Sequence, residues 1–209
     1  MLKRVSFPVA GTEVEAILHL PDGATVGGVA VLPGRGGTLA DTAYLCEALA
    51  AAGVAALQLT FRHDSDAFAG LADSAGAVRL LRAQPSIPQR VGVLGWSFGG
   101  AIAAMAAGRD SRIQAAVLIS TPATRPYFGA AKPLAELSRT RARVLLVRPA
   151  ADEVVPPADA DRYAAVLTQS RVRHALVTIE GADHNFTGPV QRGAMLDAVT
   201  TWLRAALAG

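Results

Sequence analysis

Short apolar runs alternate with helix-forming segments along nearly the whole chain of 209 residues. Strands are predicted at residues 3–9, 13–20, 28–32, 54–59, 90–94, 113–119, 144–147 and 175–179. Helices are predicted at residues 40–52, 65–83, 98–108, 157–168 and 190–207, with a further short helix near 132–139. Most of the strands are continuously apolar, which is typical of a parallel sheet covered by helices on both faces. The sequence therefore predicts a three-layer α/β fold with a mostly parallel sheet of about eight strands.

The composition supports a globular chain with a substantial core. Apolar residues make up 51% of the sequence and charged residues 18%, which excludes an intrinsically disordered chain. No internal repeat, low-complexity tract or linker interrupts the pattern. We therefore expect residues 1–209 to form a single domain. Residues 120–142 leave room for a loop and one short helix, so no cap domain is expected.

Several classes of function receive no support. The net charge is +3, but basic residues are interspersed with acids, as in Arg109-Asp110, and no nucleic-acid-binding motif is present. The single cysteine, Cys46, excludes an intrachain disulfide and a cysteine-rich metal site, and its apolar helical setting favours burial. No histidine pair at helical spacing and no phosphate-binding loop is seen, so no metal and no cofactor are expected.

The sequence also favours a location away from membranes. Met1 to Arg4 lead directly into a strand without an apolar signal-peptide region. The uncharged stretch between Arg90 and Arg109 contains Gly92, Gly95, Gly99 and Gly100 and is better explained as a strand followed by a buried helix than as a membrane span. We expect a soluble, cytoplasmic protein of undetermined oligomeric state.

The strongest functional signal is Gly95-Trp96-Ser97-Phe98-Gly99, which matches the pattern G-x-S-x-G. A buried strand precedes it and a helix follows it, the context in which this pattern forms a nucleophile elbow. The serine occupies the apex of a sharp, strained turn, and the residues two positions away must be small because other backbone passes close to them. Ser97 is therefore the predicted nucleophile.

A serine hydroxyl needs a general base within hydrogen-bond reach. His184 follows the last predicted strand, and parallel strands deliver their C-terminal loops to one edge of the sheet, so His184 shares that edge with Ser97. His63 follows an earlier strand at the same edge and stays open as an alternative. His19 lies within a strand, and His174 begins the last one. We predict His184 as the base.

The base in turn needs an acid that orients it. Asp152 follows the strand at 144–147 at the same edge and is our prediction, with Glu153 and Asp183 as weaker alternatives. The chain order Ser97, Asp152, His184 is the order expected for this fold. The tetrahedral intermediate also needs two N–H donors. We expect them from Phe98 and from the loop 34–37, where Arg35 is favoured over Gly36.

The chain resembles a small, lidless α/β hydrolase, similar to the dienelactone-hydrolase-like branch of that superfamily. The resemblance rests on the elbow at 95–99, the Asp152 segment and Asp183-His184. Two departures matter. Dienelactone hydrolases carry a cysteine where this chain has Ser97, so lactone opening does not transfer, and many relatives carry His-Gly where this chain has Pro33-Gly34.

These residues predict a serine esterase that acts on small-molecule carboxylic esters, with short acyl groups favoured by an open, apolar cleft. Thioesterase or amidase activity is the alternative within enzymes, and a catalytically silent binding protein is the alternative outside them. Trp96, Tyr127, Phe128 and Phe186 are candidates to line the cleft, although each of them could instead pack in the core.

Overall fold

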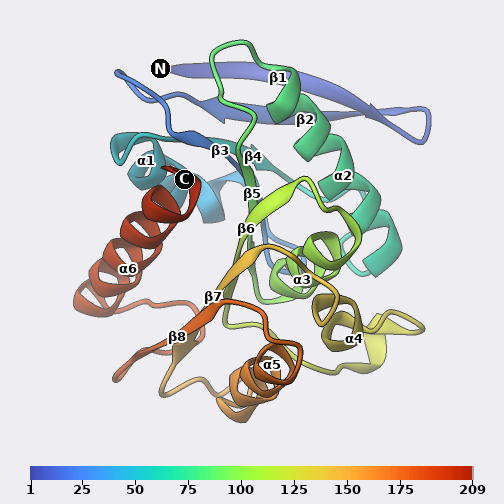
Figure 1. Ribbon diagram of the computed structural model, residues 1–209, viewed down its shortest axis with the longest axis vertical. Helices are drawn as coiled ribbons and strands as arrows, with labels where there is room; N and C mark the ends of the chain where they lie inside the picture. The colour runs from blue at the N-terminus through green and yellow to red at the C-terminus, as the bar shows by residue number, and fades with distance from the viewer. Residues whose placement is uncertain (209) are drawn as a thin grey trace.

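The computed structural model describes residues 1–208, and its centre is one eight-stranded sheet (Figure 1). The strands lie in the order β1-β2-β4-β3-β5-β6-β7-β8. Their bounds are β1 Leu2–Val9, β2 Thr12–His19, β3 Gly27–Leu32, β4 Val54–Leu59, β5 Val91–Trp96, β6 Ile113–Ile119, β7 Arg143–Pro149 and β8 His174–Ile179. Strands β3 to β8 pair in parallel, whereas β1 pairs with β2 and β2 with β4 in antiparallel fashion. The predicted mostly parallel sheet is confirmed.

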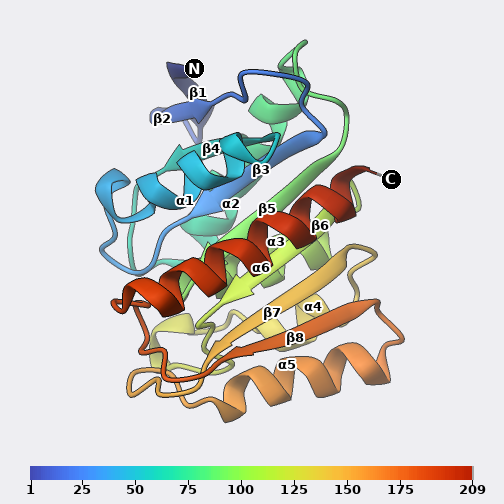
Figure 2. The same ribbon diagram turned by 90° about the vertical axis from the view of Figure 1, so that its left-hand side faces the viewer.

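Helices cover both faces of this sheet. Their bounds are α1 Leu39–Ala51, α2 Ala67–Ala83, α3 Phe98–Arg109, α4 Pro133–Leu137, α5 Ala158–Gln169 and α6 Pro189–Ala208. Helices α1 and α6 lie on one face, and α2, α3 and α5 lie on the other (Figures 1 and 2). The predicted three-layer architecture is therefore confirmed.

The core is divided between the two faces of the sheet. Every residue of β3, β4 and β5 is buried. Because successive side chains of a strand point to opposite faces, Leu57 and Leu59 join the cluster beneath α2 and α3, whereas Val54 and Ala56 join the cluster beneath α1 and α6. Continuous apolar strands are thus explained by burial on both sides.

The main differences from the sequence prediction lie between β6 and β7. Residues 126–128 form a 3₁₀ turn that was not predicted, and α4 spans only Pro133–Leu137. No cap domain is formed by this segment, as expected. Strand β5 also continues to Trp96, two residues past its predicted end, so that Ser97 follows the strand directly. Within residues 1–208, none of the helices combines the length and the hydropathy needed to cross a membrane.

Candidate active site

Ser97 forms the turn between β5 and α3. Its backbone has φ 53° and ψ −115°, a conformation that a non-glycine residue adopts at a cost of about 1–3 kcal/mol. The turn is fixed on the sheet side by the Ser97 N–H, which donates to the carbonyl of Ile119 at 2.8 Å. The strained backbone that the sequence pattern predicts at Ser97 is therefore present.

The glycines on either side of Ser97 are required by close backbone contacts. A Cβ atom on Gly95 would lie 2.0 Å from the carbonyl oxygen of Gly99. A Cβ atom on Gly99 would lie 2.3 Å from the carbonyl oxygen of Leu32. Both separations are far shorter than any real carbon–oxygen contact, so only glycine fits at these two positions.

His184 and Asp152 form a hydrogen-bonded pair. His184 follows β8, Asp152 follows β7, and the His184 Nδ1 atom lies 2.8 Å from Asp152 Oδ2. The other carboxylate oxygen, Oδ1, accepts the backbone N–H groups of Val154 and Val155, each at 2.8 Å. The carboxylate is almost fully buried, with 1% of its side chain exposed, and it accepts from three donors. This arrangement favours a proton on Nδ1 and leaves Nε2 free to accept another.

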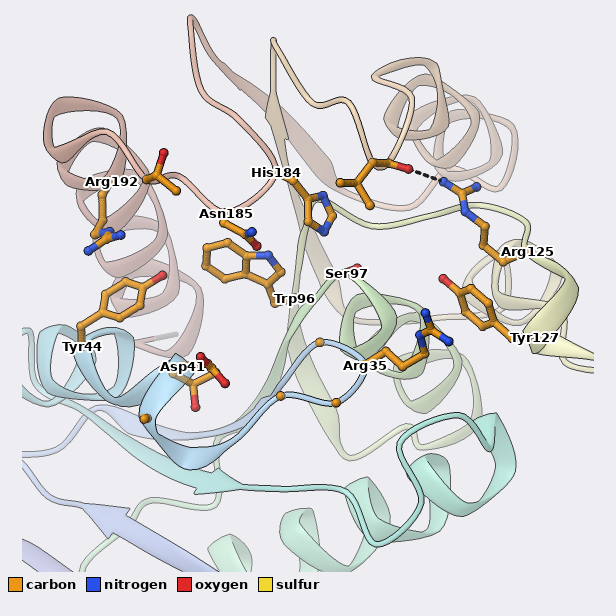
Figure 3. Close-up of a pocket in the computed structure, with 17 residues that line it drawn as sticks. Arg35, Asp41, Tyr44, Trp96, Ser97, Arg125, Tyr127, His184, Asn185 and Arg192 are labelled. Atoms are coloured by element: carbon orange, nitrogen blue, oxygen red, sulfur yellow. Dashed lines mark hydrogen bonds between the residues drawn. The ribbon is translucent and has the colours of Figure 1, made fainter.

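Ser97 and His184 line one cleft of about 780 Å³ at the carboxyl ends of the parallel strands. Figure 3 shows the imidazole of His184 directed toward Ser97, with the loop that carries Arg35 below them. Such an edge is where open α/β sheets bind ligands. The structure therefore brings together the three residues proposed as nucleophile, base and acid.

The alternative bases and acids lie elsewhere. His63 and Glu153 are exposed and do not line the cleft. Asp183 accepts the Thr187 backbone N–H at 2.9 Å and the Thr187 hydroxyl, and the bond from the hydroxyl is the main cause of a lowered pKa of the Asp183 carboxyl. The carboxyl of Asp183 is thus turned toward Thr187, while Asp152 holds the imidazole.

The remaining histidines take structural positions. His19 is buried at the end of β2, where its Nε2 lies 2.7 Å from Gln58 Oε1. His174 begins β8, at the opposite edge of the sheet from the cleft, and its Nδ1 lies 2.9 Å from the carbonyl of Val172.

The loop between β3 and α1 forms a tight turn beside Ser97. The Gly37 N–H donates to the Gly34 carbonyl at 3.1 Å, and Gly36 has φ 69°, which glycine adopts without strain. A Cβ atom on Gly34 would lie 3.7 Å from the Ser97 Cβ, so this backbone is within reach of a group bound to the serine. Arg35 and Gly36 both line the cleft. Which of their N–H groups meets an oxyanion, together with that of Phe98, stays a prediction.

Two of the four aromatic candidates line the cleft and two do not. Trp96 and Tyr127 contribute to its wall, whereas Phe128 and Phe186 are buried outside it. Phe186 has φ 49°, a local backbone turn that directs its ring inward, where it packs edge-on against Trp96 with the ring centroids 5.5 Å apart. The structure therefore assigns Phe186 to the core.

Phe128 likewise belongs to the core. It belongs to the 3₁₀ turn at 126–128, and its ring stacks on that of Phe98 with the centroids 6.4 Å apart. Its neighbour Tyr127 points to the cleft, and the guanidinium of Arg35 lies over the Tyr127 ring at 5.3 Å. The turn thus separates two adjacent aromatic residues, one toward the core and one toward the cleft.

Sequence reasoning missed the wall of the cleft that α1 and α6 form. Tyr44 of α1 and Arg192 of α6 line it, and the Arg192 guanidinium lies over the Tyr44 ring at 5.0 Å. Burial raises the pKa of Tyr44 to about 12, and the positive charge of Arg192 partly opposes that rise. The position of Tyr44, one turn into the helix that follows the loop 34–37, is a signal that could have indicated it.

Comparison with known proteins identifies the family of this chain. The family model of the dienelactone hydrolase family matches residues 57–207. No curated protein sequence matches. Among solved structures, a dienelactone hydrolase from Anabaena variabilis is 25% identical over 99% of this chain and 98% of its own, with a TM-score of 0.81.

Two further structures share the fold. Est1E from Butyrivibrio proteoclasticus is 18% identical over 99% of each chain, with a TM-score of 0.83. The esterase domain of a Rhodothermus marinus protein is 20% identical over 99% of each chain, with a TM-score of 0.78. With the family model covering residues 57–207, we conclude that this chain belongs to the dienelactone hydrolase family, within the α/β-hydrolase superfamily.

Proposed function

We propose that this protein is a serine hydrolase that cleaves carboxylic esters through an acyl-enzyme formed on Ser97. The observation that carries the proposal is the 2.8 Å hydrogen bond between His184 and Asp152, which lies beside a serine on a strained turn in the same cleft. A nucleophile, a base and an orienting acid in this arrangement form the machinery of acyl transfer. Membership of a hydrolase family and the likeness to named esterases support it.

The proposed reaction begins when the Ser97 hydroxyl attacks the ester carbonyl while His184 Nε2 takes its proton. Asp152 stabilises the resulting imidazolium through Nδ1. The oxyanion of the tetrahedral intermediate accepts the N–H groups of Phe98 and Arg35. The imidazolium then protonates the departing alcohol, and a water molecule activated by His184 releases the acid and restores Ser97.

The lining of the cleft supports short acyl groups. We expected an apolar cleft, but Arg35, Arg125, Arg192 and Asp41 contribute to its wall beside the aromatic rings. Hydrophobic stabilisation is proportional to the apolar area that is buried. A long alkyl chain that lies against these charged groups buries little apolar area, so it gains little binding free energy. A short acyl group needs only the space next to Ser97.

The first test is labelling with a fluorescent fluorophosphonate, which reacts with activated serines. We expect stoichiometric labelling of the wild type, none of Ser97→Ala and little of His184→Ala. His63→Ala, which removes the alternative base, serves as the matched control and is expected to label like the wild type. A folded wild type that does not label would contradict the proposal and favour a silent binding protein.

Acyl preference is tested with p-nitrophenyl esters of increasing chain length. We expect kcat/KM to be higher for the acetate and butyrate than for the octanoate. An octanoate that is cleaved much faster than the butyrate would contradict the assignment of short acyl groups, while leaving the esterase mechanism in place.

A further inference from the structure

Ser120 follows β6 and adopts a backbone conformation that favours glycine. Its φ is 48°, and 3% of the residue is exposed. Its N–H donates to the carbonyl of Val147 in β7 at 3.1 Å. Its hydroxyl donates to the main-chain carbonyl of His184 at 3.0 Å. A buried serine thus links the end of β6 to the loop that carries the proposed base.

The residues around Ser120 contact the segments of all three proposed catalytic residues. The carbonyl of the preceding residue, Ile119, accepts the N–H of Ser97 at 2.8 Å. The acceptor of the Ser120 N–H, Val147, belongs to the strand that leads to Asp152. The hydroxyl of Ser120 donates to the main chain of His184 itself. Residues 119 and 120 are therefore hydrogen-bonded to the segments that carry the proposed nucleophile, acid and base.

The serine at this position is not explained by the backbone alone. Glycine adopts a positive φ without steric cost, whereas a residue with a Cβ atom is strained there. What serine adds is the hydroxyl, and within residues 1–208 no other donor reaches the His184 carbonyl. Non-glycine residues in this conformation persist where the surroundings fix them, often at functional sites.

We propose that Ser120 is a positioning residue for His184. The Ser120 hydroxyl holds the main chain of His184 and so fixes the distance of the imidazole from Ser97. Asp152 fixes the rotation of the ring through its hydrogen bond with Nδ1. This inference rests on the proposed function, because it assumes that His184 acts as the base. Small displacements of a base reduce the rate of proton transfer strongly, since catalysis depends on a near-attack geometry.

Two variants test the proposal. Ser120→Ala removes the hydroxyl and keeps the strained backbone, whereas Ser120→Gly removes the hydroxyl and relieves the strain. With p-nitrophenyl butyrate we expect kcat to fall about tenfold in both, equivalent to the loss of one ordinary hydrogen bond, with KM changed less than twofold. The rate of fluorophosphonate labelling should fall with kcat. The Tm of Ser120→Gly should stay within a few degrees of the wild type, because relief of strain offsets the lost bond.

Ala10→Gly is the matched control, since Ala10 also has a positive φ, 49°, but lies in the exposed turn between β1 and β2. Its kcat should equal that of the wild type. A Ser120→Gly protein with wild-type kcat would overturn the proposal. A lower kcat together with a higher KM and a lower Tm would also overturn it, because that combination indicates general destabilisation. A wild type that is not labelled at all would instead reject the proposed function.

Discussion

At the scale of single residues, the Asp152 carboxylate is the group whose charge the site depends on most. Its oxygens accept from Val154, Val155 and His184. Asn at this position keeps the shape and one acceptor oxygen, but its NH₂ group cannot accept the Nδ1 proton. The imidazole would then hold its proton on Nε2 and could not take one from Ser97. We expect Asp152→Asn to lower kcat for p-nitrophenyl butyrate by about 10⁴-fold, with the protein still folded.

The neighbouring acid is the control for this prediction. Glu153 is exposed and makes no hydrogen bond to His184. Glu153→Gln removes the same charge one position away, and its kcat should stay within twofold of the wild type. An Asp152→Asn protein that retains a tenth or more of the wild-type rate would show that another group orients the base.

The proposed catalytic residues could be found from the sequence because each follows a strand. Parallel strands bring their C-terminal loops to one edge, so Ser97, Asp152 and His184 had to lie near each other if the strands were right. The direction of a side chain within a loop is not set by that rule. Phe186 lies two residues after His184, yet a backbone φ of 49° turns it into the core. No pattern of residue types in the sequence predicts such a turn.

At the scale of elements, the turn from β5 to α3 depends on backbone contacts that admit no side chain. We expect Gly95→Ala to destabilise the protein by about 3 kcal/mol, because its Cβ would lie 2.0 Å from the Gly99 carbonyl and both segments must shift. Thermal unfolding should show a Tm lower by roughly 6–12 °C. Even at temperatures where the variant is folded, its labelling by fluorophosphonate should be slow, since the shift displaces Ser97.

A glycine in open space provides the comparison. Gly193 lies in α6, and nothing is within 4 Å of the position of its Cβ. Gly193→Ala should stabilise the protein by about 0.5–1 kcal/mol, because alanine is the better helix former. If both substitutions changed the Tm equally, the contacts of Gly95 would not be what fixes the elbow.

Elements with strong apolar patterns were predicted nearly to the residue. Strands β4 and β6 have their predicted bounds, since each is an apolar run with a single glutamine, limited by polar residues or glycine. Between β6 and β7, the short helix predicted near 132–139 is present as α4, but the 3₁₀ turn at 126–128 was missed, because three residues are too few to show a period. The wall of the cleft from α1 and α6 was missed for a different reason. The place of Tyr44 after the loop 34–37 was a usable signal, but the contact with Arg192 depends on how α1 and α6 pack on the same face, and neither helix encodes that alone.

At the scale of the whole molecule, both layers of the core exclude water from groups that could ionise. Cys46 of α1 is fully buried in the layer beneath α1 and α6, and Tyr163 of α5 is fully buried on the other side of the sheet. Burial raises the pKa of both groups far above their ordinary values. The folded protein therefore keeps protons at high pH that the unfolded chain releases.

This difference makes stability fall on the alkaline side. The unfolded thiol of Cys46 ionises near its ordinary pKa of 9.0, whereas the buried thiol stays neutral, so its contribution is complete below pH 9 and is lost as the pH rises. Between pH 8 and pH 10 we expect the free energy of unfolding of the wild type to fall by about 1 kcal/mol more than that of Cys46→Val.

Denaturant titrations of both proteins at each pH measure this difference. The pH-independent effect of repacking valine cancels because each protein is compared with itself, and the tyrosines titrate alike in both. Parallel pH profiles would mean that the thiol ionises as readily in the folded protein as in the unfolded chain, and that water reaches the layer between α1, α6 and the sheet.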